Sequence, residues 1–328
     1  MKLKYSVLAV ALSLGLAACG GTENSNTSTT EPAKQTVANQ TESEKANQLF
    51  EELFMEGVMR SPIYQTYMAI KKDYGKWDDI SEARAEEDLA LAKTNLEKVK
   101  QIDVSKLDPQ TALSHKLMVQ QLEDQIADHK WRYHNYPVNQ MFGLHSMVPS
   151  LLINQHQITD VSDAEAYISR INGVPTLFAE LEKGLNKRAD MGIIAPKFVY
   201  PYVISDSKNL LKGAPFDDGE DSTLLADIKR KLDTLEIDQA EKDKLIEQTT
   251  TALIKSFKPA YESLVANLES LEARADTKDG AWKFPEGGAF YNNALKNTTT
   301  TDLTSHEIHE IGLAEVARIH DEMRDIMK

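Results

Sequence analysis

Residues 280–328 read GAWKFPEGGAFYNNALKNTTTTDLTSHEIHEIGLAEVARIHDEMRDIMK, and the end of this stretch has a strong helical pattern. Thr304 and Glu307 have the spacing of a capping box, in which a hydroxyl and a carboxylate satisfy the free amides of a first helical turn. After them, apolar residues recur at helical spacing and predict one apolar stripe: Ile308, Ile311, Val316, Ile319, Met323 and Ile326.

The sequence stops at Lys328, directly after this stripe. No Gly or Asn closes the predicted helix and no Pro follows it, although such residues commonly end helices. Large exposed apolar patches are uncommon on soluble monomers. We therefore expect a truncated chain whose stripe is covered by a missing C-terminal half or by a companion polypeptide.

The rest of the chain is also helical in its periodicity, and no alternating strand pattern persists. We predict an all-α domain over residues 44–328, built from long antiparallel helices that Pro175 and Pro259 partly kink. At most a short extended or hairpin segment is expected near residues 284–301, best placed at 284–291. Other expectations are a short helix over 63–74, helix starts at Ser81, Asp108-Pro109, Ser162 and Asp238, and a loop over 135–149.

The first residues indicate export. Lys2 and Lys4 precede a short apolar run, and Leu16-Ala17-Ala18-Cys19 resembles a bacterial lipobox. We predict a signal peptide over 1–18, lipidation at Cys19, and a polar tether over 19–43 that holds the domain near the membrane. Gly20, where an inner-membrane retention signal usually has Asp, favours the outer membrane, with the protein facing the periplasm. The alternative is an ordinary secretory signal with a chance cysteine.

Composition excludes some partners. The chain has 41% hydrophobic and 27% charged residues, and removal of residues 1–18 would take away Lys2 and Lys4 and change the net charge from −14 to −16. Such an acidic surface argues against nucleic acid as a partner, because phosphates would be repelled. Cys19 is the only cysteine, so no disulfide within the chain is expected.

His306 and Glu310 are candidate metal ligands, because residues four apart lie on one face of a helix. His306 and His309 are only three apart, so the zinc motif His-Glu-x-x-His is absent. A zinc site also needs at least one further protein ligand. The alternative, which we favour, is a solvated first helical turn in which Glu307 benefits from the helix dipole.

The segment around residues 139–145 is a second candidate site, because loops held on a rigid scaffold often carry function. We name Asn139, Gln140, His145 and Tyr291 as residues that could line a cleft. The alternative, which we favour, is a buried connector that packs Met141 and Phe142. No catalytic residue is proposed, since the sequence contains no Gly-x-Ser-x-Gly elbow, phosphate-binding glycine loop or dinucleotide fingerprint.

The same C-terminal stretch resembles the bacterial family called domain-of-unknown-function 885. The resemblance lies in Phe284-Pro285-Glu286-Gly287-Gly288, Phe290-Tyr291, residues 299–304 and, most specifically, residues 302–319. Similarity extends back to Pro137-Val138-Asn139-Gln140 and residues 167–171. Members of this family are longer, largely helical and often exported or lipid-anchored.

The resemblance implies a metallopeptidase-like hydrolase acting on peptides. Family members carry, in their later half, a His-Glu stretch followed by Pro-Gly-His-His that looks like a zinc site. This stretch is absent here, so the family's zinc ligands are not carried over and we expect this chain alone to be inactive, with no cofactor of its own. Other interpretations remain open: a helical binding or scaffolding lipoprotein, one half of a split enzyme, or an unstable truncated product.

Overall fold

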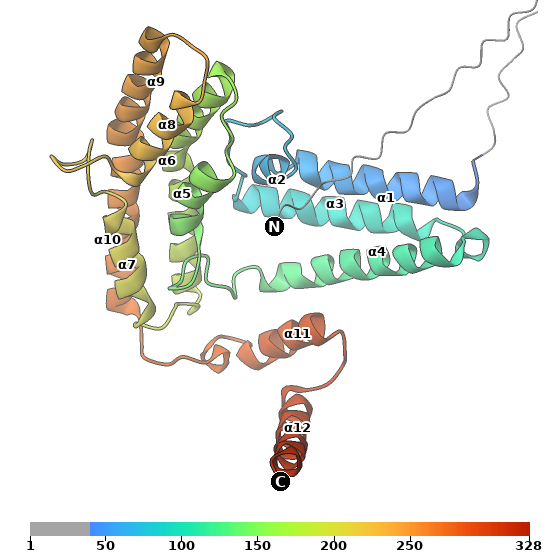
Figure 1. Cartoon of the computed structure of the whole chain (residues 1–328). Helices are drawn as coiled ribbons and strands as arrows, with labels where there is room; N and C mark the ends of the chain where they lie inside the picture. The colour runs from blue at the N-terminus through green and yellow to red at the C-terminus, as the bar shows by residue number, and fades with distance from the viewer. Residues whose placement is uncertain (1–39) are drawn as a thin grey trace, which may run out of the picture. The chain divides into compact units, whose positions relative to one another are not determined.

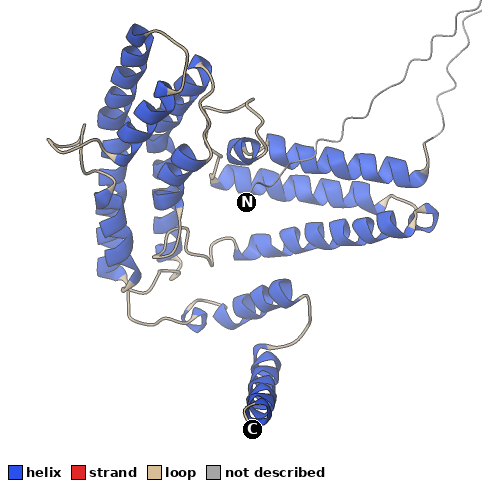
Figure 2. Cartoon of the chain, in the orientation of Figure 1, coloured by secondary structure: helices blue, strands red, loops and turns tan. Residues whose placement is uncertain are grey.

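The computed structural model describes residues 40–328 (Figure 1). The predicted signal peptide, Cys19 and most of the predicted tether lie outside the described residues. Figure 2 shows that the described part is built from helices and connecting segments. Its only extended pairings are two isolated bridges, Val138 with Gly143 and Ala214 with Asp221. The all-α prediction is therefore confirmed. Within residues 40–328, no helix combines the length and the apolar composition needed to cross a membrane.

The α-helices are, in chain order, α1 (Glu42–Met59), α2 (Pro62–Tyr67), α3 (Glu82–Lys100), α4 (Pro109–Asp128), α5 (Leu144–Asn154), α6 (Val161–Asp190), α7 (Val199–Asn209), α8 (Thr223–Asp233), α9 (Gln239–Ala252), α10 (Lys258–Arg274), α11 (Gly287–Thr299) and α12 (Ser305–Ile326). Four short segments complete the set: η1 (Val104–Lys106), η2 (His129–Trp131), η3 (Leu253–Phe257) and η4 (Ala281–Lys283).

Helices α1, α3 and α4 pack against one another and form an N-terminal bundle (Figure 1). Ser81 and Asp108 cap α3 and α4 as predicted, each accepting a hydrogen bond from the amide three residues later. Helix α1 begins at Glu42, two residues before the predicted start of the helical domain, because Thr41 forms a capping box with Glu44. The bundle has a small core of its own: Ala92, Leu96, Val99 and Leu122, with Leu49, Phe50 and Leu53 packed on it.

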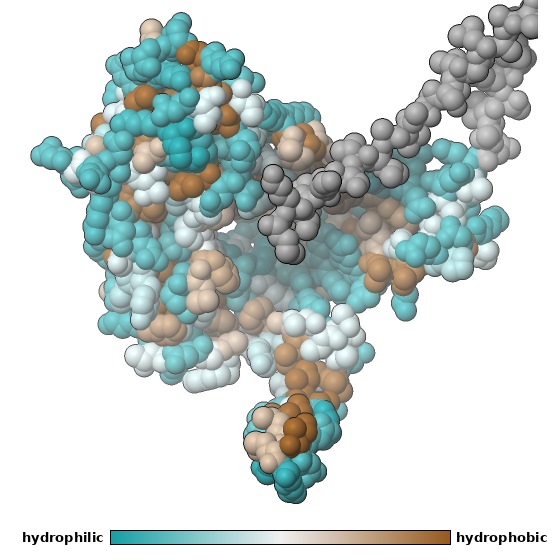
Figure 3. Space-filling model, viewed as in Figure 1, coloured by the Kyte–Doolittle hydropathy of each residue, from teal (hydrophilic) through white to brown (hydrophobic). Residues whose placement is uncertain are grey.

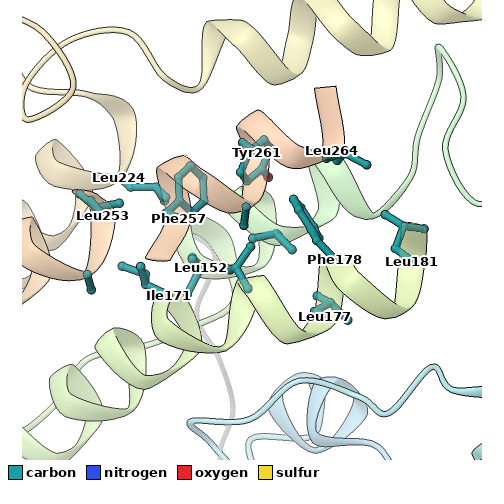
Figure 4. Packing of buried hydrophobic residues seen from close by; sticks show 14 of the residues in the cluster. Leu152, Ile171, Leu177, Phe178, Leu181, Leu224, Leu253, Phe257, Tyr261 and Leu264 are labelled. Atoms are coloured by element: carbon teal, nitrogen blue, oxygen red, sulfur yellow. The ribbon is translucent and has the colours of Figure 1, made fainter. Parts of the chain in front are cut away.

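The larger core forms around α6, which packs against α9, η3 and α10. Figure 4 shows apolar side chains from these helices meeting in one cluster. Phe178 of α6 meets Tyr261 of α10 edge-on, with ring centroids 4.8 Å apart, and Phe257 lies 4.4 Å from the same tyrosine ring. The Tyr261 hydroxyl donates to the carbonyl of His145, so the one polar atom of this buried side chain has a partner.

One continuous helical run connects Gln239 to Arg274, as predicted from Asp238 onward. The bend expected at Pro259 corresponds to a change of helix type: η3 is a π-helical segment that ends two residues before this proline. Proline lacks an N–H and its ring collides with the carbonyl four residues earlier. A wider π turn at that carbonyl accommodates both effects without ending the helix.

The segment best placed for a hairpin, residues 284–291, forms no hairpin: residues 284–286 form a bend and a turn, and the chain is helical from Gly287 onward. Helix α11 starts at Gly287, after Glu286 adopts a left-handed backbone with φ of 54°. A Cβ at Gly287 would lie 2.0 Å from the carbonyl of Ala281, so only glycine fits this approach. Thr298 and Thr299, which looked like an extended segment, donate their hydroxyls to carbonyls four residues earlier and remain helical.

The expected loop over 135–149 is shorter than predicted, because α5 begins at Leu144. Gly143 is the N-cap of α5. Its φ is 151°, and a Cβ there would lie 2.7 Å from the carbonyl oxygen of Pro137, so the position favours glycine. Helix α2 ends at Tyr67 and not at Tyr74. Helix α6 starts at Val161 with Asp160 as its cap, one residue before the predicted Ser162, and runs through Pro175.

Helix α12 has the predicted capping box at Thr304 and Glu307 but buries none of its residues. Its packing contacts are with α11. Val316, Ile319 and Met323 are 53%, 43% and 53% exposed. The apolar side of α12 appears as a brown surface bordered by hydrophilic residues in Figure 3.

We predict that Leu268→Ala lowers the free energy of unfolding by about 2–5 kcal/mol, because Leu268 is fully buried on α10 and its loss leaves a cavity. Leu313→Ala on α12 removes the same atoms from a side chain that is 54% exposed, and should cost no more than about 0.5 kcal/mol. Urea denaturation of both variants measures the difference. Equal losses would contradict the assignment of the core to α10.

Candidate functional site

The candidate metal ligands His306 and Glu310 lie in the first turns of α12, in solvent. Nδ1 of His306 is 4.0 Å from Oε1 of Glu310. Within residues 40–328, no group of three or more His, Cys, Asp or Glu side chains is arranged to hold a metal ion. A zinc ion needs at least three protein ligands, so the two residues do not fit such a site by themselves.

The candidate cleft residues Asn139, Gln140 and His145 fall on the turn before α5 and on its first residues. The Asn139 side chain accepts hydrogen bonds from the amides of Met141 and Phe142, at 2.8 and 3.1 Å, and so fixes the turn. Met141 and Phe142 point to solvent, 78% and 67% exposed, so the buried connector that packs them is not formed within the described residues. Gln140 is exposed.

His145 is buried at the start of α5, and burial lowers its pKa. Its carbonyl accepts from Tyr261, and its buried Nδ1 has no hydrogen-bond partner. Tyr291, the fourth candidate, is half-exposed on α11. None of the four side chains lines the cavities described below, so their role as cleft residues stays a prediction.

The strongest polar cluster of the described residues surrounds Arg170, which α6 carries into the protein interior. Its side chain is fully buried. Nε donates to the carbonyl of Lys76, and one terminal nitrogen donates to the Thr66 hydroxyl and the Pro62 carbonyl, at 2.5 and 3.3 Å. Every one of these partners precedes α3. Arg170 therefore attaches the α2–α3 segment to the central helix.

His156 completes this cluster and is fully buried. Its Nε2 lies 2.9 Å from the carbonyl of Asp163, and its Nδ1 lies 3.1 Å from a terminal nitrogen of Arg170. Since a carbonyl only accepts and a guanidinium only donates, Nε2 carries the proton and Nδ1 is an acceptor. The imidazole is thus neutral, and it stacks on Tyr74 with ring centroids 4.1 Å apart. Burial lowers the pKa of His156 to about 3.

The segment attached by Arg170 borders a cavity of about 500 Å³ between α1, α2, α3 and α4, which we call the N-terminal cleft. Its apolar lining comes from the bundle: Leu53, Val58, Leu91, Ala92, Met118 and Leu122. Phe54 and Tyr64 form an edge-to-face pair on its border, with centroids 6.3 Å apart and 41% and 45% exposure. An apolar wall with exposed aromatic rings is typical of ligand sites.

Polar groups at the same cleft are mostly engaged with each other. Asp88 binds both Arg60 and Arg84, at 2.8 and 3.0 Å. Arg84 also donates to the carbonyl of Arg60, at 2.7 Å. The buried Asn95 amide donates to Glu56, at 2.8 Å. These bonds fix the shape of the cleft, and they leave its apolar wall as the feature available to a ligand.

Sequence reasoning did not single out Arg170 or the charged residues of the cleft. A signal for Arg170 was present, because it falls between Ile168 and Ile171 on the apolar side of α6. A lone arginine inside an apolar pattern indicates a buried cation with specific partners. The cleft gave no comparable signal, because its residues come from four helices.

The fold and the cleft define an all-α protein with a ligand-sized cavity in its N-terminal bundle. The chain belongs to the family described as "Bacterial protein of unknown function (DUF885)", whose model matches residues 62–328. The resemblance drawn from the C-terminal stretch is confirmed. A search of curated proteins finds no match.

The solved structures that resemble the chain include two lipoproteins. "The putative lipoprotein from Colwellia psychrerythraea" is 20% identical with a TM-score of 0.73, and the match covers 87% of this chain and 51% of that one. A "putative lipoprotein of unknown function from Shewanella oneidensis" is 15% identical with a TM-score of 0.60, covering 88% and 47%. At these identities the likeness shows the fold alone. The chain spans about half the length of both proteins.

We predict that His156 makes the protein sensitive to acid. The folded-state pKa of about 3 lies below the ordinary value of 6.5, so the unfolded state binds the extra proton as pH falls from 6.5 toward 3. The associated stability is present above pH 6.5 and is lost through that window, on the order of a few kcal/mol. His156→Gln keeps a donor and an acceptor but does not titrate, so its free energy of unfolding should change less between pH 7 and pH 4.5.

Urea denaturation at the two pH values gives the measurement. His115→Gln is the matched control, because His115 also bonds a backbone carbonyl, that of Val99, but is only partly buried. It should show the same pH dependence as the unmodified protein. An unchanged pH dependence in His156→Gln would show that the protonation of His156 is not responsible.

Proposed function

We propose that this chain is the helical, non-catalytic portion of a lipid-anchored cell-envelope protein, and that it forms one wall of a metallopeptidase-like hydrolase. The observation that carries the proposal is the uncovered apolar side of α12. Among the described residues, α12 contacts α11, yet none of its own side chains is buried. An exposed apolar patch of this kind usually marks an interaction site.

The partner of α12 is proposed to be an apolar helical surface, supplied by a C-terminal half or by a companion polypeptide. Most helices in proteins gain their stability from packing an apolar face against another element. The family resemblance supports this assignment, because longer members carry a further half. The two structural neighbours support it too, since the chain matches about half of each.

Zinc chemistry, if present in the complete assembly, is assigned to that other portion. When bound, zinc would activate water for peptide hydrolysis. His306 and Glu310 do not form a fitting site, because they are exposed and no third ligand lies beside them among the described residues. This chain would contribute the helical wall and its cleft, and no metal ligand.

A second candidate function is non-enzymatic binding by a helical lipoprotein. The N-terminal cleft favours it, because its volume of about 500 Å³ is in the range of small-molecule sites. Native mass spectrometry of the protein released gently from membranes distinguishes the two. A small molecule retained in stoichiometric amount, and lost from Leu91→Trp, which fills the apolar wall, would favour the binding function.

The anchor is tested at Cys19. Cys19→Ala should abolish palmitate incorporation and move the protein from the membrane fraction to the soluble periplasmic fraction, because stable anchoring needs the acyl chains. Lys208→Ala is the control, because it only removes a surface ion pair with Glu269 and should leave both readouts unaffected. Palmitate labelling that persists in Cys19→Ala would refute the lipobox.

The non-catalytic role is tested on the chain from residue 20 onward. We expect no peptide cleavage with added zinc. Chelator-sensitive cleavage by this chain would refute the proposal. Hydrogen exchange on the same sample should show the amides of α12 exchanging far faster than those of α6, because α6 is packed in the core and α12 is not. Equally slow exchange would show that α12 is already covered.

A further inference from the structure

A second cavity, of about 210 Å³, is lined by an unusual concentration of basic residues; we call it the basic pocket. Its walls come from the residues that begin α3, from the residues after η2, and from the last turns of α6. It shares no lining residue with the N-terminal cleft. It also does not depend on the function proposed above.

Four of its lining residues are cationic and two are acidic. The cations are Arg132, Lys183, Lys187 and Arg188, and the acids are Glu82 and Glu180. The whole chain has a net charge of −14, so a local excess of positive charge runs against its composition. Like charges held close together repel each other. Glutamates pair with Arg132, Lys183 and Lys187, and they leave Arg188 without a carboxylate partner.

Three of these cations surround a single ring, that of the buried Tyr133. Lys187, Arg132 and Arg188 lie 4.4, 4.8 and 5.3 Å from its centroid. Lys187 also donates to the Tyr133 hydroxyl, at 2.6 Å. The ring gives each cation a modest attraction, and it holds them in place in the wall of the pocket.

Arg188 lacks an acidic partner. Its nitrogens donate to Asn135 and to the carbonyls of Gly184 and Arg132, and none of these acceptors is a carboxylate. Burial lowers its pKa to about 10, so it remains a cation at pH 7. Arg188 is partly buried, and a charge that is withdrawn from water without an opposite charge beside it is costly.

Arg132 also has unused binding capacity. One terminal nitrogen pairs with Glu82 and Glu86, at 2.7 and 3.2 Å. Its Nε is buried and has no acceptor. Buried donors without an acceptor are rare in native proteins and call for an explanation. A small shift of this side chain toward a ligand would satisfy that atom.

The helix dipole of α6 accounts for only part of the cluster. Cations are favoured at a helix C-terminus, and Lys187 and Arg188 lie in its last turn. Lys183 lies before that turn, and Arg132 is on another segment. On the α3 side, Ser81 caps the helix, and its side chain already accepts from the amide of Arg84. The attraction for an anion therefore comes from the four cations of the pocket.

We infer that the basic pocket binds a small oxyanion of the phosphate class, either free or as the phosphoryl group of a lipid headgroup. Its volume suits an ion of that size and is small for a nucleotide. Without a ligand, the carboxylate of Glu82 neutralises part of the positive charge, because it pairs with both Arg132 and Lys187. Its side chain is 43% exposed, so it can turn toward solvent when an anion binds.

The inference makes opposite predictions for two variants. Lys183→Ala removes a cation of the wall that is 71% exposed and bonded only to Glu180. It should weaken the binding of inorganic phosphate about three- to tenfold while leaving the melting temperature unchanged. Glu82→Gln removes the internal competitor, and should tighten phosphate binding about fivefold. A purely structural cluster predicts no gain of affinity in Glu82→Gln.

The experiment is isothermal titration calorimetry with sodium phosphate, against sodium chloride at matched ionic strength. Lys208→Ala is the control, because Lys208 forms a surface pair with Glu269 away from the pocket, and its phosphate affinity should stay within about twofold of the unmodified protein. The same titrations are repeated with sodium acetate, and with vesicles of phosphatidylglycerol or of phosphatidylcholine, in place of sodium phosphate.

Phosphate binding with the expected order of affinities, Glu82→Gln above the unmodified protein above Lys183→Ala, supports a free phosphate ligand. The same order on phosphatidylglycerol vesicles, without binding of the free ion, supports the lipid headgroup as its source. Acetate that binds as tightly as phosphate overturns the phosphate class. No binding of free phosphate or vesicles up to about 10 mM, or equal affinities in all variants, overturns the site.

Discussion

The buried guanidinium of Arg170 is the interaction on which the arrangement of the sites depends. It binds the carbonyls of Pro62 and Lys76 and the hydroxyl of Thr66, all of which lie far from it in the sequence. The segment it holds continues directly into the borders of both cavities. Ser61, Tyr64 and Asp78 line the N-terminal cleft, and residues 80–82 line the basic pocket. One side chain of the central helix thus sets the position of two separate walls.

Arg170 is held by neutral hydrogen-bond partners, although a buried arginine commonly pairs with a carboxylate. Arg170 is surrounded by carbonyls, a hydroxyl and a neutral imidazole, and the rings of Tyr74 and Trp77 lie 5.3 and 5.5 Å from its guanidinium carbon. Directional bonds to several chain segments fix geometry better than a single ion pair does. Trp77 adds a bond of its own, from its indole nitrogen to the carbonyl of Arg170, at 2.7 Å. These hydrogen bonds offset part of the free energy that burying the guanidinium costs, and they fix its position.

The sequence was informative wherever local chemistry determines structure. The caps at Ser81, Asp108, Asp238 and Thr304, and the helical class as a whole, follow from side chains that act within a few residues. It was misleading where a distant contact overrides local preference. The glycines and threonines of residues 287–301 suggested an extended segment, but Phe284 and Phe290 pack with Tyr133 and Tyr136 and hold α11 in place. The cleft and the basic pocket were not predictable, because each collects residues from several segments whose packing no short pattern encodes.

The π-helical segment η3 has an evolutionary consequence. Such a segment is equivalent to one residue inserted into an α-helix, and it lies between two halves of one apolar stripe: Leu245 and Leu253 before it ends, Tyr261, Leu264 and Leu268 after it. The wider turn takes up the additional residue, so Leu264 and Leu268 beyond it stay on the face that meets α6. In a regular α-helix of the same sequence length, the residues beyond the insertion would lie about 100° further around the axis and would turn away from α6. Loss of one residue at this point would therefore return the run to a regular α-helix and keep its packed face.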